Sequence, residues 1–320
     1  MRASLFALLI SAAIPFAGPT HAGEPNWPDH LAIGTASPGG TYYVYGEGLA
    51  RLLTRTLSLP VVRSPTEGPA QNIELLESGE AKLGFVTTGI ALQAWNGTGV
   101  WAGKRPARSM RVAFPMYDTP FQLIVLQDSG LRAVSEMGFK RVGIGPRGGT
   151  TAAYLPEFFN TLKIHVQFLF GEWEELAAQM ERRELDVIAA GGGVPLPAFI
   201  ELEAKERVRY IAFPSDQLAA LRLAMPELTP SLIPAGTYPS LLRPYQTLGL
   251  YNFAVAHELL PDDLVYNVVR SVFEHHEEMM EVHSAAAATI PANMDHNSFL
   301  PLHPGAIRYY VQIGRAGQSD

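Results

Sequence analysis

Two short corners of the chain carry residue types that suit the binding of an anion. The first is SPGGTY, residues 37–42, and the second is PRGGTT, residues 146–151. Glycines there allow backbone N–H groups to face outward where a helix is expected to begin, and the helix dipole favours negative charge at that point. The candidate ligand-binding residues at the two corners are Ser37, Gly39, Gly40, Thr41, Tyr42, Arg147, Gly148, Gly149, Thr150 and Thr151. A tight turn followed by a helix cap is the alternative, because it uses the same residue types.

Arg147 adds a cation to the second corner. Its guanidinium could pair with a ligand carboxylate through two parallel hydrogen bonds, or it could simply be a solvated loop arginine. The repetition of one corner in one chain suggests two similar halves that face a common ligand.

Small polar residues also follow other expected strands. TEGPAQN, residues 66–72, follows the second strand, VTTG, residues 86–89, follows the third, and a glycine-rich loop, AAGGGVPLP, begins at Ala189. These segments add the candidates Thr66, Gln71, Asn72, Thr87, Thr88 and Gly192. Each of the polar residues could equally cap a helix or form a turn.

Other kinds of chemistry find little support. The spacing from Gly34 to Thr41 nearly matches a phosphate-binding loop, but Gly40 stands where the lysine should be. His276, Met280 and His283 share a helical face, yet Met280 occupies the place of the second histidine in a zinc motif. The chain contains no G-x-S-x-G motif and no cysteine nucleophile. We therefore expect no catalytic residues, no metal and no cofactor.

Strand-like and helix-like segments alternate along most of the chain, which predicts an α/β fold with a mostly parallel sheet. Right-handed crossovers then bring the carboxyl ends of the strands to one edge, where open α/β sheets bind ligands. The expected strands are 31–35, 59–65, 81–88, 141–145, 166–170, 186–190 and 207–214, and the expected helices are 42–57, 70–78, 152–162, 173–184, 262–283 and a short stretch near 308–314.

Two β-prone segments suggest how the chain divides. Residues 111–130 look too long for one strand and contain Pro115 and Pro120, so we interpret them as a crossover into a second lobe. Residues 247–256 can return the chain to the first lobe. We therefore predict two lobes joined by crossing strands, in which residues 29–116 and 247–320 form lobe I and residues 117–246 form lobe II.

The N-terminus and the composition indicate where the protein works. Arg2 precedes a 13-residue apolar run, Leu5 to Ala17, and small residues follow, so residues 1–22 are predicted to be a signal peptide cleaved near Ala22. The chain has no cysteine for a disulfide or a lipid, and its net charge of −7, without a basic run, argues against nucleic acid. We expect a soluble, monomeric protein in the periplasm.

Five ordered motifs resemble a known family. The segments beginning at Ile33, Thr66 and Val142, with IPAGTYPSL and LHPGAIRYYVQIG, are together similar to the TAXI receptors of tripartite ATP-independent periplasmic (TRAP) transporters. The resemblance implies the two-lobed Venus-flytrap fold of periplasmic binding proteins, with crossing hinge strands between two α/β lobes. The lobes would clamp a small organic anion, such as a glutamate-like amino acid or a dicarboxylate, and deliver it to a separate membrane permease. Where many relatives read like GGSVEN and PPGSGT, this chain has EGPAQN and PRGGTT, which puts the substrate, though not the class, in question.

The sequence therefore predicts an extracytoplasmic solute receptor that binds a small carboxylate and delivers it to a TRAP-type permease. A ligand-binding subunit of a sensory system is an alternative, because the same fold can present its ligand to a signalling partner. A secreted enzyme on this fold would need an activated nucleophile or a metal, which the motifs do not supply.

Overall fold

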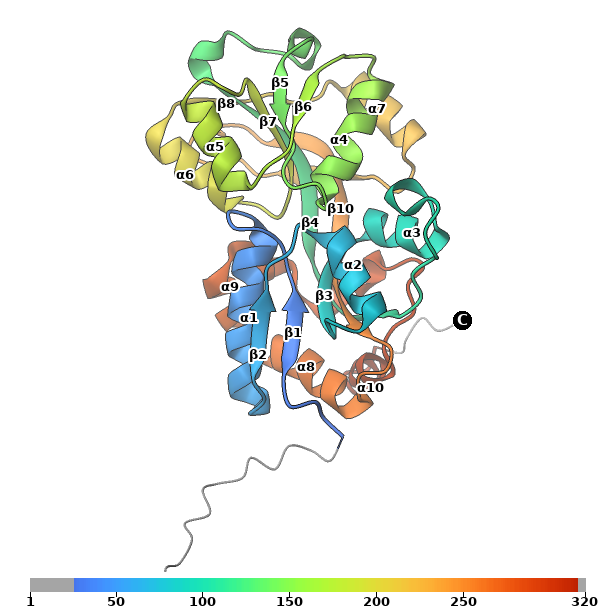
Figure 1. Ribbon diagram of the computed structural model, residues 1–320. Coiled ribbons are helices and arrows are strands. Elements are labelled where there is room, and N and C mark those ends of the chain that lie inside the picture. Colours follow the sequence, from blue (N-terminus) through green and yellow to red (C-terminus); the bar gives the residue numbers. More distant parts are fainter. Residues whose placement is uncertain (1–25, 316–320) are drawn as a thin grey trace, which may run out of the picture.

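The computed structural model describes residues 26–315, so the predicted signal peptide lies outside the described residues. Two α/β lobes are stacked end to end, and the long strands β4 and β10 run from one to the other (Figure 1). Within residues 26–315, no helix has the length and apolar character needed to cross a membrane.

The first lobe is built on three short parallel strands in the order β2-β1-β3, extended by β10. Every residue of β3 is buried, as expected for a strand covered on both faces. The elements of this part are β1 (Leu31–Gly34), α1 (Thr41–Leu57), β2 (Val61–Ser64), α2 (Pro69–Ser78), β3 (Leu83–Thr87) and α3 (Thr88–Asn96). The expected strands and helices are present here, and α3 is an additional helix that begins directly at the end of β3.

The crossover is a pair of long antiparallel strands, β4 (Met110–Leu126) and β10 (Tyr245–His257). The expectation that residues 111–130 are too long for one strand was therefore wrong. One half of β4 pairs with β10, and the other half reaches the second lobe, where it pairs with β7 and β8. Pro115 is tolerated because it lies where the register with β10 shifts, next to Phe253.

The second lobe repeats the plan of the first, with strand order β4-β7-β5-β6 and parallel pairing of β5 with both β6 and β7. Strand β8 pairs with β4, and β9 pairs with β10. The elements are β5 (Arg141–Gly143), α4 (Thr150–Thr161), β6 (Gln167–Leu169), α5 (Trp173–Glu181), β7 (Val187–Gly191), α6 (Pro197–Lys205), β8 (Val208–Tyr210), α7 (Ser215–Ala224) and β9 (Thr229–Ile233). Helices α6 and α7 and strand β9 were not predicted.

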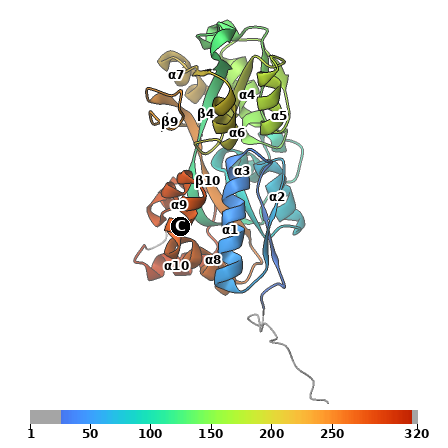
Figure 2. The same ribbon diagram turned by 90° about the vertical axis from the view of Figure 1, so that its left-hand side faces the viewer.

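The C-terminal helices return to the first lobe, where the first two pack beside α1 and the third packs against the first of them (Figure 2). They are α8 (Asp262–Glu274), α9 (His276–Val282) and α10 (Pro304–Gln312). The single helix expected over residues 262–283 is broken at His275, whose φ of −115° and ψ of 33° leave the helical region. Short 3₁₀ turns lie at Gly99–Trp101, Gln127–Ser129, Val134–Met137, Ser284–Ala288 and Pro291–His296.

The apolar core is continuous across the junction of the lobes. One cluster joins Ile90 and Val86 of the first lobe to Phe121 on β4 and to Phe158 of α4 in the second. Gly89 in α3 permits this packing, because a side chain there would collide with the hydroxyl of Tyr154 from α4. The two strand-to-helix edges therefore face each other at close range.

Candidate ligand-binding site

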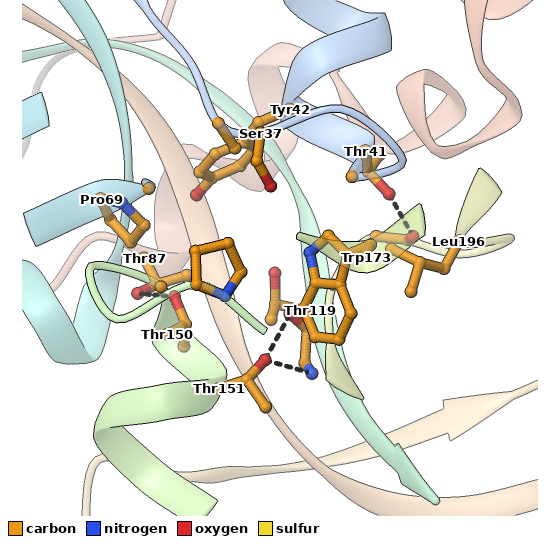
Figure 3. Close-up of a pocket in the computed structure, with 18 of the residues that line it drawn as sticks. Ser37, Thr41, Tyr42, Pro69, Thr87, Thr119, Thr150, Thr151, Trp173 and Leu196 are labelled. Atoms are coloured by element: carbon orange, nitrogen blue, oxygen red, sulfur yellow. Dashed lines mark hydrogen bonds between the residues drawn. The ribbon is translucent and has the colours of Figure 1, made fainter. Parts of the chain in front are cut away.

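A cavity of about 50 Å³ lies between the two lobes at the facing strand-to-helix edges (Figure 3). Residues from both lobes and from hinge strand β4 line it. The lining consists of Ala36, Ser37, Gly40, Thr41, Tyr42, Glu67, Gly68, Pro69, Thr87, Thr119, Pro146, Gly149, Thr150, Thr151, Trp173, Gly191, Gly192, Gly193 and Leu196. The two corners singled out in the sequence thus contribute to one cavity.

Six helices begin at this cavity. The N-cap residues of α1, α2, α3, α4 and α6 all line it, as does Trp173, the first residue of α5. In none of these six helices does the N-cap side chain accept a hydrogen bond from a first-turn N–H group. The first-turn N–H groups of a helix have no partner inside the helix, and each helix start carries about half a positive charge. The cavity therefore has a positive potential that does not depend on cationic side chains.

Among the lining residues there is no lysine, arginine or histidine, and Glu67 is the one carboxylate. The Glu67 carboxylate accepts a hydrogen bond from the backbone N–H of Gly148 at 3.0 Å, just before α4 begins. The carbonyl of Gly148 accepts in return from the N–H of Ala70 at 3.3 Å. This pair of contacts joins the segment after β2 in lobe I to the second glycine corner, residues 146–151, in lobe II.

Hydroxyl groups of the lining also form hydrogen bonds across the cleft. Thr41 donates to the carbonyl of Gly193 at 2.6 Å, and Thr87 and Thr150 share a hydrogen bond of 3.1 Å. Within lobe II, the hydroxyl of Thr151 accepts from the N–H of Gly191 at 2.8 Å. The structure is thus a closed arrangement in which both edges are held together by direct contacts (Figure 3).

Ser37 differs from these residues. Its side chain is 3% exposed, it lines the cavity, and its hydroxyl has no hydrogen-bond partner among the described residues. Buried hydroxyl groups nearly always find a partner, because leaving one unsatisfied costs about 1–3 kcal/mol. The hydroxyl of Ser37 is therefore available to a ligand in the cavity.

Tyr42 connects the cavity to the hinge. Burial raises the pKa of its phenol well above the ordinary value, so the group stays protonated and can donate. It donates to the side-chain oxygen of Asn252 on β10 at 2.5 Å, and the Asn252 amide donates to the hydroxyl of Thr119 on β4 at 2.7 Å. Both hinge strands are thereby tied to the first turn of α1.

Seven of the sixteen sequence-predicted residues do not line the cavity. Asn72 is fully buried and bridges two strands, because its amide donates to the carbonyls of Thr35 and Phe85, both at 2.8 Å. Thr66 donates to the same Asn72 side chain, and Gln71 accepts from the N–H of Glu67. These three residues brace the corner after β2. The full set outside the lining is Gly39, Thr66, Gln71, Asn72, Thr88, Arg147 and Gly148.

The structure does not bring Arg147 into the cavity. Its guanidinium lies over the ring of Phe170, 4.0 Å from the ring centre, a stacking that favours both groups. Gly39 has a φ of +77° and its carbonyl accepts from the N–H of Ala198 at 3.2 Å, so it forms the turn and joins the lobes. Thr88 is the first residue of α3.

Several lining residues were not predicted. Thr119 lies in the middle of β4, in a segment we had interpreted as a crossover and not as one strand. Trp173 is the first residue of α5, a helix that was predicted without a role in binding. Glu67 and Pro69 lie inside the TEGPAQN segment, beside residues that were chosen. Gly191 and Gly193 flank the predicted Gly192. Their position directly after a strand was the signal that could have identified them.

His276 of α9 and His283, which directly follows this helix, have structural partners. His276 hydrogen bonds to the carbonyl of Ala286 at 2.7 Å, and His283 to that of Pro195 at 3.0 Å. Across residues 26–315, no three His, Cys, Asp or Glu residues are grouped so as to hold a metal ion.

Comparison with known proteins shows the family and the fold of this chain. Residues 33–314 match the model of the NMT1-like family, and the chain belongs to that family. Solved structures of similar fold include the periplasmic binding protein BugD (12% identity, 90% of this chain and 95% of that one, TM-score 0.58). MatC from Rhodopseudomonas palustris with bound malate is a second such structure (12% identity, 90% of this chain and 97% of that one, TM-score 0.56). A periplasmic transporter is a third (12% identity, 90% of this chain and 93% of that one, TM-score 0.53). The fold is that of two-lobed periplasmic substrate-binding proteins.

Proposed function

We propose that this protein is an extracytoplasmic solute receptor that closes its two lobes on a small carboxylate. The observation that carries the proposal is the meeting of six helix starts, without capping side chains, around one cavity between the lobes. Such an arrangement stabilises an anion through backbone N–H groups and helix dipoles. Hinged closure then removes the competing water. The malate bound to MatC is consistent with this chemistry on a related fold.

The finer parts of the proposal come from the sequence. We assign lobe I to residues 29–116 and 247–320 and lobe II to residues 117–246, and we place the mature protein in the periplasm after removal of residues 1–22. The partner is the membrane permease of a TRAP transporter, as the TAXI resemblance implies. A sensory subunit would bind its ligand in the same way and differ only in its partner.

The proposal excludes chemistry on the ligand, because nothing in the cavity resembles an activated nucleophile. Titration calorimetry of the purified protein against a panel of small carboxylates should show one-to-one binding. Nuclear magnetic resonance of the same mixtures should show each ligand unchanged after prolonged incubation. Turnover of a bound acid would establish an enzyme instead. Uptake of the acid into vesicles that contain the permease, dependent on added receptor, would separate a transporter from a sensor.

A further inference from the structure

We infer that Trp173 is a ligand-binding residue of the second lobe, and that its indole N–H donates a hydrogen bond to an oxygen of the bound carboxylate. This inference rests on the proposed function, since it assumes that the cavity binds a carboxylate. It places a side-chain donor of lobe II on the same cavity as Ser37 of lobe I, so that one ligand contacts both lobes.

The ring of Trp173 is supported by its own lobe. Trp173 is the first residue of α5, and only 7% of its surface is exposed. Gly145, just after β5, leaves room for the six-membered part of the indole, because a Cβ there would lie 2.5 Å from Cζ2 of Trp173. The φ of Gly145 is +73°, which also favours glycine. Contacts within lobe II therefore help to set the position of the indole.

The five-membered part of the indole faces the first glycine corner across the cleft. A Cβ at Gly40 would lie 3.4 Å from Cδ1 and 3.5 Å from Nε1 of Trp173. A Cβ at Gly39 would lie 3.1 Å from the Cβ of Trp173. In Figure 3 the indole projects among the lining residues, with its nitrogen toward the side where Ser37 and Thr41 lie. The two lobes thus meet at Trp173 in the closed arrangement.

The N–H of this indole lacks an acceptor, since within residues 26–315 no hydrogen bond is formed by Nε1 of Trp173. Two other indoles are satisfied by the protein. Trp27 donates to the carboxylate of Asp263 at 2.9 Å. Trp101 donates to the carbonyl of Arg105 at 3.0 Å. Because an indole N–H can only donate and usually finds a partner when it is buried, an oxygen of the ligand is the acceptor that completes the site.

Ser37 and Trp173 offer complementary donors from the two lobes. The hydroxyl of Ser37 is buried, unpartnered and on the same cavity. The carbonyl of Ser37 is already engaged, because it accepts from the N–H of Gly40 at 3.3 Å. A carboxylate has two oxygens, each able to accept more than one hydrogen bond, so it can accept from both side chains. The ligand then joins lobe I to lobe II and stabilises the closed arrangement.

The test removes the N–H and keeps the shape of the ring. Replacing Trp173 by 3-benzothienylalanine puts a sulfur atom in place of the N–H in a bicyclic ring of similar shape. The full mature protein is titrated in a calorimeter at neutral pH with acetate, lactate, succinate, malate and glutamate. We expect the affinity for the tightest of these acids to drop about tenfold. The melting temperature without acid should not change, because the N–H has no protein partner. The same replacement at Trp95, outside the cavity, is the matched control.

Each other outcome overturns a stated part of the argument. Unchanged affinity after the replacement at Trp173 would overturn the inference, while the proposed function stands. A lower affinity together with a lower melting temperature of the free protein would show a packing role for the ring and would overturn the donor role. If the wild type binds none of the five acids, the proposed function fails and the inference fails with it.

Tryptophan fluorescence gives a second readout, because Trp173 is the one tryptophan among the four of the chain that lines the cavity. Saturation with the tightest acid should shift the emission of the wild type and of the control Trp95→Phe. The shift should be absent in Trp173→Phe, since the remaining tryptophans lie outside the cavity. A shift that persists in Trp173→Phe would contradict the contact between Trp173 and the ligand.

Discussion

The two glycine corners share backbone geometry but use their side chains differently. Gly40 and Gly149 are both N-cap residues in extended conformation, with φ of −95° and −83°, and both line the cavity. At the first corner the hydroxyl of Ser37 remains unpartnered. At the second corner the hydroxyls of Thr150 and Thr151 already contact other parts of the protein.

This difference indicates a division of roles. The first corner provides a side-chain donor to the ligand, whereas the second corner provides its helix start and the contacts that hold the lobes together. Gly148 illustrates the second role, because both its N–H and its carbonyl bond to lobe I. The comparison therefore predicts that changes at the two corners affect binding through different steps.

The largest effect is expected from Gly40→Val. A Cβ at this position would lie 3.2 Å from the carbonyl oxygen of Ser37 and 3.4 Å from the Trp173 ring, so the valine methyl groups would enter the cavity. The backbone does not require glycine, since φ is −95°. We expect at least a hundredfold loss of affinity by calorimetry, and a melting temperature lowered by only a few degrees.

Gly138→Val is the control for this change, because a Cβ there meets nothing within 4 Å and φ is −52°. Normal binding by Gly40→Val would remove the first corner from the site. Outright unfolding would mean that the corner supports the fold and not only the ligand.

Glu67→Gln tests the closing role of the second corner. Glutamine weakens the charge-assisted hydrogen bond to the N–H of Gly148 but keeps the shape of the side chain. Because this contact forms when the lobes close, we expect roughly a threefold to tenfold faster ligand dissociation in stopped-flow measurements, with little change in association. Glu74→Gln, on the following helix α2 and paired with Lys104 outside the cavity, is the control. A slower association rate with an unchanged dissociation rate would contradict the role of Glu67 in holding the lobes closed.

His283 provides a pH-dependent contact between the lobes. Its Nδ1 accepts from the N–H of Ala285, so Nε2 carries the hydrogen donated to Pro195, and burial lowers the pKa of the ring below its ordinary 6.5. The unfolded chain then binds a proton more readily, so this contribution to stability is complete above pH 6.5 and is lost as pH falls below it.

We expect the melting temperature of the wild type to fall more steeply than that of His283→Gln between pH 7 and pH 5. Other buried histidines shift in the same direction, so the measured quantity is the difference between the two proteins. If the melting temperatures of the two proteins fall equally with pH, protonation of His283 does not contribute to the pH dependence of stability.

The smallest effect is expected from Arg147→Ala, although the sequence had suggested a ligand contact. Its guanidinium is stacked on Phe170 outside the cavity. Affinity should therefore change by less than about twofold, since an exposed cation acts on the cavity only through screened electrostatics. A loss of tenfold or more would bring Arg147 back into the site and remove the distinction between the corners.

The sequence predicted what depends on local pattern. Strands followed by glycine and a helix placed Ser37, Thr41, Thr150 and Thr151 at strand ends, and the structure has them on one cavity. It could not predict that Arg147 stacks on Phe170, because that contact joins two loops by tertiary packing.

Longer-range features were missed for the same reason. The prolines in β4 break a local strand pattern, yet pairing with β10 and β7 keeps the strand continuous through both lobes. Thr119, inside that strand, and Trp173, at a helix start, reach the cavity only because the lobes close on each other. Thr66 and Asn72 were predicted to bind the ligand, but their side chains form hydrogen bonds with buried protein groups instead.

The central claim is that six helix starts hold one carboxylate between the lobes. It is tested most directly by denaturing the purified protein and identifying the released small molecules by mass spectrometry, with the Gly40→Val variant as the matched blank. The account predicts a small carboxylate, in a one-to-one ratio with the wild type and absent from the variant. A cationic or uncharged molecule in the same ratio would contradict the anion site.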